Sequence, residues 1–272
     1  MRVTTLVENR GAGELGGEHG IAFWVEVQGE RPLLFDTGQS GILVQNAQRL
    51  GVDLAHTRAI IFSHGHYDHT NGLSTVLEKA RPERIYVPVN FFAGHFRGEH
   101  KYIGMNFTRQ ELQARGLQIV SVTDDVIDLG SNVFIITNIP RSTDYEVVTD
   151  PFMIEQNGQL VAEDFQDELA LVLRTKQGVV LLVGCSHCGV VNIARHAARV
   201  FGENRIFALI GGTHLVSADA ARINNTIADL RDLGVELLAA SHCTGEKAER
   251  QMRAAFKEKF CPNVSGTTFS FP

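Results

Sequence analysis

The sequence has little cysteine and little proline, with four cysteines and seven prolines among 272 residues. So few cysteines in a chain of this length do not indicate a disulfide framework, and we expect reduced thiols. No proline-rich linker, charge block or low-complexity run divides the chain. We therefore predict one domain over residues 1–272, whose hydrophobic fraction of 44% is enough for a sizeable core.

Basic residues and long apolar runs are also scarce. Lysine and arginine total 25 against 31 aspartates and glutamates, which gives a formal net charge of −6. A nucleic-acid surface normally carries a basic stripe, and none is visible, so we expect no nucleic-acid partner. No apolar run approaches the ~20 residues that span a bilayer, and residues 1–10 lack the apolar core of a signal peptide. We expect a cytoplasmic protein without membrane contact; the sequence gives no indication of its oligomeric state.

Apolar segments alternate with helical patterns along the chain, which predicts sheets covered by helices. The β-rich beginning favours mixed sheets over purely parallel ones. The pattern weakens over residues 90–116, where we expect a loop or lid. The predicted helices are 41–50, 72–80, 191–200, 219–233 and 246–256, and the predicted strands are 2–7, 21–27, 32–35, 59–62, 84–89, 117–122, 133–136, 170–174, 179–183, 206–210 and 235–239.

The most informative stretch is Ser-His-Gly-His-Tyr-Asp-His at 63–69, which follows the predicted strand 59–62. In an extended loop His64 and His66 project to the same side, so both rings can reach one metal ion. Asp68 and His69 follow, where the chain turns toward a helix, and can hold a second metal nearby. Imidazole and carboxylate ligands suit Zn, Fe or Mn better than Ca or Mg. A solvated histidine-rich loop is the alternative.

Four predicted strands end in small residues followed by histidine, although the chain has only 11 histidines. Because ligand sites in α/β sheets gather at the carboxyl ends of strands, this repetition predicts a single site. The four histidines are His64, His187, His214 and His242.

The segment His-Gly-His-Tyr-Asp-His matches HxHxDH, and on this motif the chain resembles the metallo-β-lactamase superfamily of metallohydrolases. The resemblance implies an α/β (α+β) fold, a four-layer αββα sandwich with helices covering two mixed sheets. It also implies two divalent metal ions, Zn first, with Mn or Fe as alternatives. The expected ligands are His64, His66, Asp68, His69, His187 and His242.

One ligand position departs from the superfamily pattern, which usually places a metal-bridging aspartate at the end of a strand. Here that strand ends in Gly-Cys-Ser-His at 184–187. His187 can replace the missing ligand, and Cys185 can either bind as a thiolate or remain a small buried thiol. By the same resemblance, Asp36 would orient metal-binding imidazoles; otherwise it makes only the Asp-Thr-Gly turn.

Further motifs resemble one branch of the superfamily, named after 7,8-dihydropterin-6-yl-methyl-4-(β-D-ribofuranosyl)aminobenzene-5′-phosphate synthase. The motifs are Glu-His-Gly at 18–20, Ile-Pro-Arg at 139–141, Gly-Cys-Ser-His-Cys-Gly at 184–189, Gly-Gly-Thr-His-Leu at 211–215 and Ser-His-Cys-Thr-Gly at 241–245.

The resemblance implies a hydrolase of phosphoesters or phosphodiesters in which a metal-bound hydroxide attacks a small phosphorylated substrate. Asp68 would hold the nucleophile, and His214 would contact substrate or protonate the leaving group; the alternative for His214 is a core histidine. Arg141 and His19 would bind substrate, and the alternative for Arg141 is a surface arginine. The alternative is a metal-dependent transferase that joins a dihydropterin-methyl diphosphate to an aryl-ribose phosphate, and a third hypothesis is a non-catalytic sensor.

The remaining histidines divide by position. His95 and His100 lie in the region expected to be a loop, where either could face the site. His56 and His196 sit beside charged or helical surface positions, and we expect both to be solvated.

Overall fold

The computed structural model describes residues 1–272. The chain forms two compact units, each assembled from separate segments. Unit 1 comprises Met1–Thr123, Asp150–Asp167 and Val264–Ser270; unit 2 comprises Asp124–Thr149, Glu168–Asn263 and Phe271–Pro272. Because the segments interleave, the units do not correspond to two consecutive domains, and a single domain over 1–272 stays a prediction.

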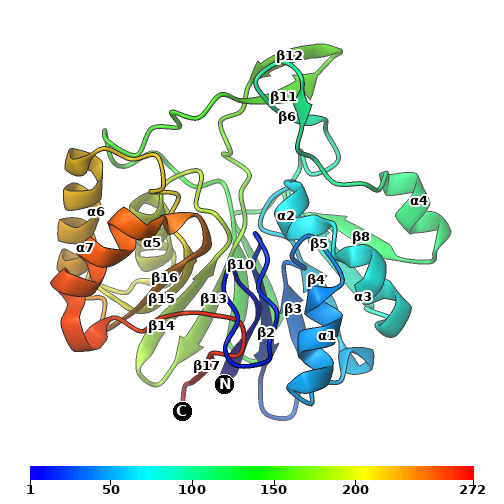
Figure 1. The fold of residues 1–272 in the computed structure, drawn as a ribbon, viewed down its shortest axis with the longest axis horizontal. Helices are drawn as coiled ribbons and strands as arrows, with labels where there is room; N and C mark the ends of the chain where they lie inside the picture. The colour runs from blue at the N-terminus through cyan, green and yellow to red at the C-terminus, as the bar shows by residue number, and fades with distance from the viewer. The chain divides into compact units, whose positions relative to one another are not determined.

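Unit 1 contains a seven-stranded mixed sheet in the order β17-β1-β2-β3-β4-β5-β8 (Figure 1). The pairs from β17 to β3 are antiparallel, and those from β3 to β8 are parallel. All of these strands except β17 were predicted from the sequence. Their bounds are β1 Arg2–Val7, β2 Ala22–Glu26, β3 Leu33–Phe35, β4 Ala59–Ile61, β5 Arg84–Val87, β8 Gln118–Ser121 and β17 Thr268–Ser270.

The two longer helices of unit 1 each bury a small set of apolar side chains. In α1 (Ile42–Arg49) the buried apolar residues are Leu43 and Ala47, one turn apart, and the helix packs against β1 and α3. In α3 (Leu73–Lys79) they are Leu73, Val76 and Leu77. The short elements are η1 Leu54–His56, α2 Tyr67–Thr70 and α4 Arg109–Ala114.

A four-stranded sheet in unit 1 was not predicted. Its order is β12-β11-β6-β7, and it joins two segments about 50 residues apart in sequence. Residues 90–116, expected to be a loop, contain two of its strands and also α4, which begins with a capping box between Thr108 and Glu111. The strand bounds are β6 His95–Arg97, β7 Lys101–Tyr102, β11 Phe152–Gln156 and β12 Gln159–Ala162.

Unit 2 is built on a six-stranded mixed sheet in the order β16-β15-β14-β13-β10-β9. Its strands β14, β15 and β16 are parallel, so their carboxyl ends lie along one edge of the sheet. Of the six strands, only β9 was missed by the sequence. The bounds are β9 Val126–Gly130, β10 Val133–Ile136, β13 Ala170–Thr175, β14 Gly178–Val183, β15 Ile206–Gly212 and β16 Leu237–Ser241.

Three helices of unit 2 pack in sequence, α5 (Val190–Phe201) against α6 (Ala220–Asp232) and α6 against α7 (Glu246–Phe256) (Figure 1). The first also contacts β14 and the last β16. Gly202 ends α5 in the left-handed region, with φ of 65°, which an L side chain rarely adopts. The predicted helices are thereby confirmed; the remaining short elements are η2 His242–Thr244 and η3 Lys257–Lys259.

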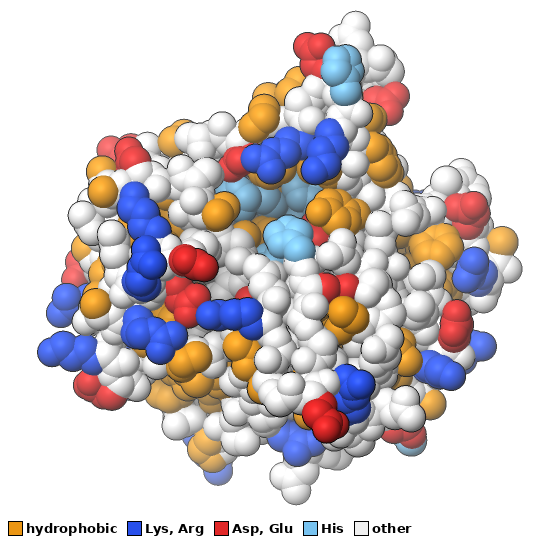
Figure 2. Space-filling view, viewed as in Figure 1, with side chains coloured by type: hydrophobic (Ala, Val, Ile, Leu, Met, Phe, Trp, Pro, Cys, Tyr) orange, Lys and Arg blue, Asp and Glu red, His pale blue; other side chains and the backbone are white.

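Two surface properties can be compared with the sequence predictions. None of the helices has the length and apolar character needed to cross a bilayer. On the face that Figure 2 shows, Lys and Arg side chains are interspersed with Asp and Glu side chains, and histidine side chains reach the surface.

Candidate metal centre

The histidine motif covers the loop after β4 and the first residues of α2, so it lies at the carboxyl end of a strand in the parallel part of the mixed sheet. His66 precedes the first residue of α2, and Asp68 and His69 lie within that helix. The His69 N–H donates to the His66 carbonyl, which closes the turn. The four predicted ligands of this motif are buried, with exposed fractions of 0 to 6%: His64, His66, Asp68 and His69.

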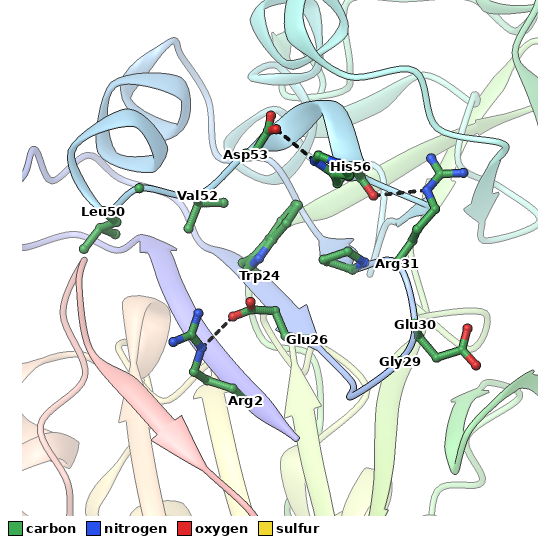
Figure 3. A pocket seen from close by; sticks show the side chains of 12 residues that line it. Arg2, Trp24, Glu26, Gly29, Glu30, Arg31, Leu50, Val52, Asp53 and His56 are labelled. Carbon is green, nitrogen blue, oxygen red and sulfur yellow. Dashed lines mark hydrogen bonds and ion pairs between the residues drawn. The ribbon is translucent and has the colours of Figure 1, made fainter.

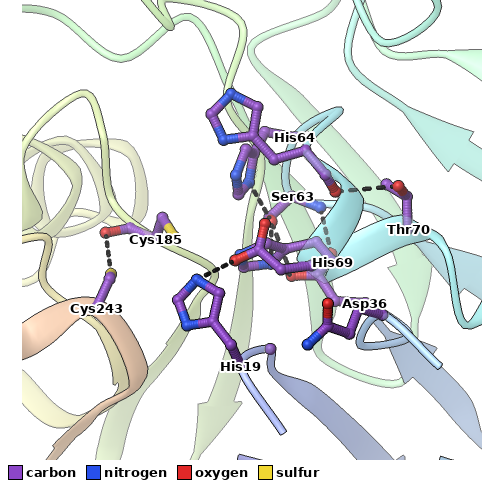
Figure 4. A network of polar contacts seen from close by, with 12 residues as sticks. His19, Asp36, Ser63, His64, His69, Thr70, Cys185 and Cys243 are labelled. Carbon is purple, nitrogen blue, oxygen red and sulfur yellow. Dashed lines mark hydrogen bonds and ion pairs between the residues drawn. The ribbon is translucent and has the colours of Figure 1, made fainter. Parts of the chain in front are cut away.

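The buried carboxylate of Asp36 contacts both ends of the histidine motif. Asp36 Oδ2 lies 2.7 Å from His69 Nδ1 and accepts a hydrogen bond from the Ser63 hydroxyl, while Asp36 Oδ1 accepts from the Ser63 N–H (Figure 4). With Nδ1 engaged by the carboxylate, His69 presents Nε2 as its ligating atom. The expectation that Asp36 contacts a predicted ligand imidazole is confirmed by this geometry.

His64 is fixed in a similar way by its neighbour, because Ser63 Oγ lies 2.8 Å from His64 Nδ1. The centroid of the His64 ring is 4.6 Å from that of His66 and 4.2 Å from that of His69. Burial, followed by the proximity of the other imidazoles, lowers the pKa of His64 well below its usual value. Burial also lowers the pKa of His66. Neutral imidazole is the form that binds a metal.

Asp68 faces two imidazoles of unit 1. Its Oδ2 lies 3.2 Å from His19 Nε2 and 3.6 Å from His69 Nε2. The His19 side chain is about half exposed, whereas that of Asp68 is 8% exposed. His19 therefore joins a predicted ligand to solvent, which suits the substrate-side role expected for it.

His95 and Glu163 also belong to this cluster, although the sequence singled out only the first, as one of two loop histidines. Glu163 Oε1 lies 2.8 Å from His95 Nδ1, and Glu163 Oε2 lies 3.7 Å from His66 Nε2. Both side chains are buried. The only available signal was the lone histidine, because Glu163 lies 97 positions after His66 in a segment with no motif.

Unit 2 places its three predicted histidines at one edge of its sheet. His187 follows β14, His214 follows β15 and His242 follows β16. All three are buried, and the ring centroids of His187 and His214 are 4.2 Å apart. The three histidines therefore follow adjacent parallel strands, as the repeated strand–histidine pattern predicted. That they share a single centre with the histidines of unit 1 stays a prediction.

Two cysteines accompany the histidines of unit 2. The ligating atoms of Cys185, His214 and Cys243 all lie within 4.8 Å of one another. Cys243 Sγ accepts the His214 N–H at 3.3 Å. It also contacts the Cys185 carbonyl at 3.3 Å (Figure 4). Burial opposes ionisation of the Cys243 thiol, but its contacts with Cys185 and His214 prevail and lower its pKa. For Cys185, a thiolate ligand and a small buried thiol both stay open.

Backbone strain is concentrated at these positions. Among the ten non-glycine residues with positive φ, four belong to or adjoin the two histidine sets: Asp36, Ser186, His214 and His242. Such conformations are unfavourable for most side chains and persist where surrounding structure enforces them, commonly at functional sites.

The donor set fits the metals implied by the sequence. Each unit offers several buried imidazoles, with the carboxylates of Asp68 and Glu163 in unit 1 and thiols in unit 2. Imidazole with carboxylate matches Zn, Fe or Mn, and a thiolate favours Zn or Fe. The Asp36–His69 pair is the outer support that such ligands normally have.

The remaining residues considered in the sequence analysis differ in their exposure to solvent. Arg141 and His100 are exposed, and so is His56, as predicted. The prediction that His196 is solvated is wrong: its exposed fraction is 3%, because the face of α5 that carries it is covered. Arg199 Nη2 lies 2.9 Å from His196 Nδ1, so a cation donates to this ring.

Unit 1 also has a pocket whose lining does not include the histidine motif. Its lining includes Arg2, Trp24, Arg31 and His56, and contains no predicted ligand (Figure 3). Its exposed Asp53–His56 pair, 2.8 Å apart, resembles the Asp36–His69 pair in chemistry but is open to solvent. It provides a matched control for the buried pair.

Comparison with known proteins agrees with this geometry. The sequence profile described as the Metallo-beta-lactamase superfamily matches residues 15–191. The chain belongs to this superfamily. The metallo-β-lactamase assignment accounts for the mixed sheets, their covering helices and the histidine motif after β4.

Two relatives of this metallo-β-lactamase superfamily member are similar over nearly the whole chain. The 7,8-dihydropterin-6-methyl-4-(beta-D-ribofuranosyl)-aminobenzene-5'-phosphate synthase of Methanocaldococcus jannaschii is 30% identical over 96% of this chain and 93% of its own. The crystal structure of Tm1679, a metal-dependent hydrolase of the beta-lactamase superfamily, is 31% identical, with a TM-score of 0.87, over 99% of this chain and 98% of its own.

A more distant structure shows the same fold. Human tRNase Z, short form, has a TM-score of 0.55 with 15% identity and covers all of both chains. The metallo-β-lactamase fold predicted from the sequence is confirmed by these comparisons.

Proposed function

We propose that this protein is a binuclear metal-dependent hydrolase of a small phosphoester or phosphodiester. The observation that carries the proposal is the buried imidazole–carboxylate cluster of unit 1, fixed from behind by Asp36. The similarity to a metal-dependent hydrolase over 99% of the chain supports it. The proposed ligands of two Zn, Mn or Fe ions are His64, His66, Asp68, His69, His187 and His242.

Bound divalent metals would supply Lewis acidity to a phosphoryl oxygen and would lower the pKa of water. The protein's share of the reaction is positioning and proton handling. Asp36 holds the proton of His69 at Nδ1 and so fixes its tautomer. Asp68 is proposed to orient the attacking water through a carboxylate oxygen, and His19, 3.2 Å from that carboxylate, to steady it.

His214 is the proposed proton donor to the leaving group. Its ring lies beside His187, and its backbone is held by Cys243, so its position is fixed at two points. Arg141 is exposed, and its guanidinium can bind the anionic end of a substrate. A small phosphorylated molecule is the substrate class that these groups suit.

A second candidate function is favoured by the 30% identity to the synthase over 96% of the chain. In that reaction the amine of an aryl-ribose phosphate would form a C–N bond to the methylene carbon of a dihydropterin-methyl diphosphate, and free diphosphate would leave. The same metal ligands would hold the diphosphate, and Arg141 would bind the ribose phosphate. Hydrolysis needs only water as its second reactant, whereas the transfer needs a second organic substrate.

One experiment separates the two functions. The metal-loaded protein is incubated with the dihydropterin-methyl diphosphate, with and without the aryl-ribose phosphate, and the products are identified by mass spectrometry. A hydrolase gives a phosphate-containing cleavage product in both mixtures. A condensed product formed only in the complete mixture would establish the transferase instead.

A further inference from the structure

Glu163 lies between two buried imidazoles of unit 1. One carboxylate oxygen is 2.8 Å from His95 Nδ1, and the other is 3.7 Å from His66 Nε2. The exposed fractions of His66, His95 and Glu163 are 4, 2 and 7%. The ring centroids of the two histidines are 5.6 Å apart, close to perpendicular.

The four-stranded sheet brings these groups together. His95 in β6 pairs with Ile154 in β11, and Glu163 follows β12, with its N–H donating to the Phe152 carbonyl. The same sheet is joined to the histidine motif by main-chain contacts, since the Tyr67 N–H donates to the Ile103 carbonyl. The position of His95 and Glu163 relative to His66 is therefore set by backbone structure.

Gly65, between the two motif histidines, allows this approach. A Cβ at this position would lie 2.5 Å from His95 Nε2 and 2.8 Å from the Phe91 carbonyl, too close for any side chain. The HxHxDH pattern leaves this position open, and here glycine lets the His95 ring pack directly against the motif backbone.

The other sides of His66 are closed by aromatic rings. The ring centroids of Phe152 and Phe165 lie 5.2 and 5.5 Å from that of His66. In such an apolar enclosure a carboxylate needs partners, and the imidazoles provide them.

From this geometry, and resting on the proposed metal-dependent function, we infer that Glu163, held by His95, is a positioning residue that engages His66 at Nε2 and leaves Nδ1 as the metal-ligating atom. This complements the Asp36–His69 pair, in which the carboxylate engages Nδ1 and leaves Nε2. His66 and His69 thus use opposite ring nitrogens, each selected by its own buried carboxylate.

An alternative is that His66, His95 and Glu163 themselves hold a cation, since their ligating atoms lie within 4.8 Å of one another. A cation at this position would require His66, already a proposed ligand of the metal centre, to bridge two metals. Positioning accounts for the same contacts without a third metal.

The test uses Glu163→Gln, which keeps the shape of the side chain and removes its charge. Glu155→Gln is the matched control, because Glu155 lies on β11 of the same sheet and is exposed. Apo proteins are titrated with Zn²⁺ and Co²⁺, and affinity, stoichiometry and the visible Co²⁺ spectrum are recorded. His95→Gln is the second variant, should Glu163→Gln fail to fold.

We expect Glu163→Gln to bind one metal about 10- to 100-fold more weakly and to change the Co²⁺ spectrum, with the melting temperature of the apo protein nearly unchanged. His95→Gln should shift the affinity in the same direction, and Glu155→Gln should match the wild type. Equal affinity and an unchanged spectrum in Glu163→Gln would overturn the inference. So would a third metal equivalent in the wild type that Glu163→Gln loses. Absence of metal binding by the wild type would instead contradict the proposed function.

Discussion

Asp36 Oδ2 lies 2.7 Å from His69 Nδ1, and both side chains are fully buried. The same carboxylate accepts two hydrogen bonds from Ser63, at the start of the histidine motif. Asp36, the residue directly after β3, therefore contacts both ends of the histidine motif at 63–69, which follows β4. The rigidity of the proposed metal centre in unit 1 depends on this pair.

Replacing Asp36 by Asn should weaken metal binding about 10- to 100-fold, because the amide cannot hold the His69 imidazole as a carboxylate does. Asn is the suitable substitution, since residue 36 has φ of 59° and Asn tolerates the left-handed region. Metal titration of the apo protein measures the effect. The control is Asp53→Asn, which disrupts the exposed Asp53–His56 pair and should leave affinity unchanged. Equal effects of the two substitutions would refute the role of Asp36.

Replacing Asp68 by Asn should remove most turnover, about 100-fold or more, while the fold is retained. The carboxylate is both a proposed ligand and the proposed support of the attacking water. Initial rates with a phosphodiester substrate, together with circular dichroism, measure the two properties separately. A rate equal to that of the wild type would rule out this assignment.

Removing the metals should lower thermal stability. A ligand present at 100 times its Kd stabilises the folded state by about 2.7 kcal/mol, provided that the unfolded chain does not bind it. Chelated protein should therefore melt at a lower temperature and regain stability on addition of Zn²⁺. His64→Ala in unit 1 and His242→Ala in unit 2 should each bind less metal. Full metal stoichiometry in either variant would exclude that histidine as a ligand.

His196 gives a pH dependence that is independent of the metal centre. Burial, and next the Arg199 guanidinium, lower the pKa of this imidazole in the folded protein. The unfolded chain then binds more protons between the folded pKa and about 6.5, so folding stability falls as pH drops below about 6.5. In His196→Gln this loss should be smaller than in the wild type, as measured by thermal melts of the apo proteins between about pH 7.5 and 5.5. Identical slopes would show that His196 does not contribute.

Much of the fold was predictable because its central strands and longer helices have strong apolar patterns. The strands β13 and β14 pair along all six residues of each, and α5 buries eight of its twelve residues. The elements missed were short, polar or at sheet edges. In β12 three of four residues are exposed, so no alternation distinguishes it from a loop.

The candidate site was predictable where a dense motif or a repeated strand ending marked it, as for His64 or His214. Glu163 carried no such signal, because its relation to His66 arises only when a hairpin pairs with β6. The burial of His196 was missed because a histidine beside arginine on a helix normally faces solvent, and here the neighbouring structure covers it.

The most direct test of the central claim is hydrolysis of bis(p-nitrophenyl) phosphate by apo protein reloaded separately with Zn²⁺, Mn²⁺ or Fe²⁺. A metal-dependent phosphodiesterase should be inactive as the apo protein, regain turnover with at least one of these metals, and lose it in His66→Ala. Stoichiometric metal loading without turnover, or turnover equal in His66→Ala and the wild type, would contradict the account.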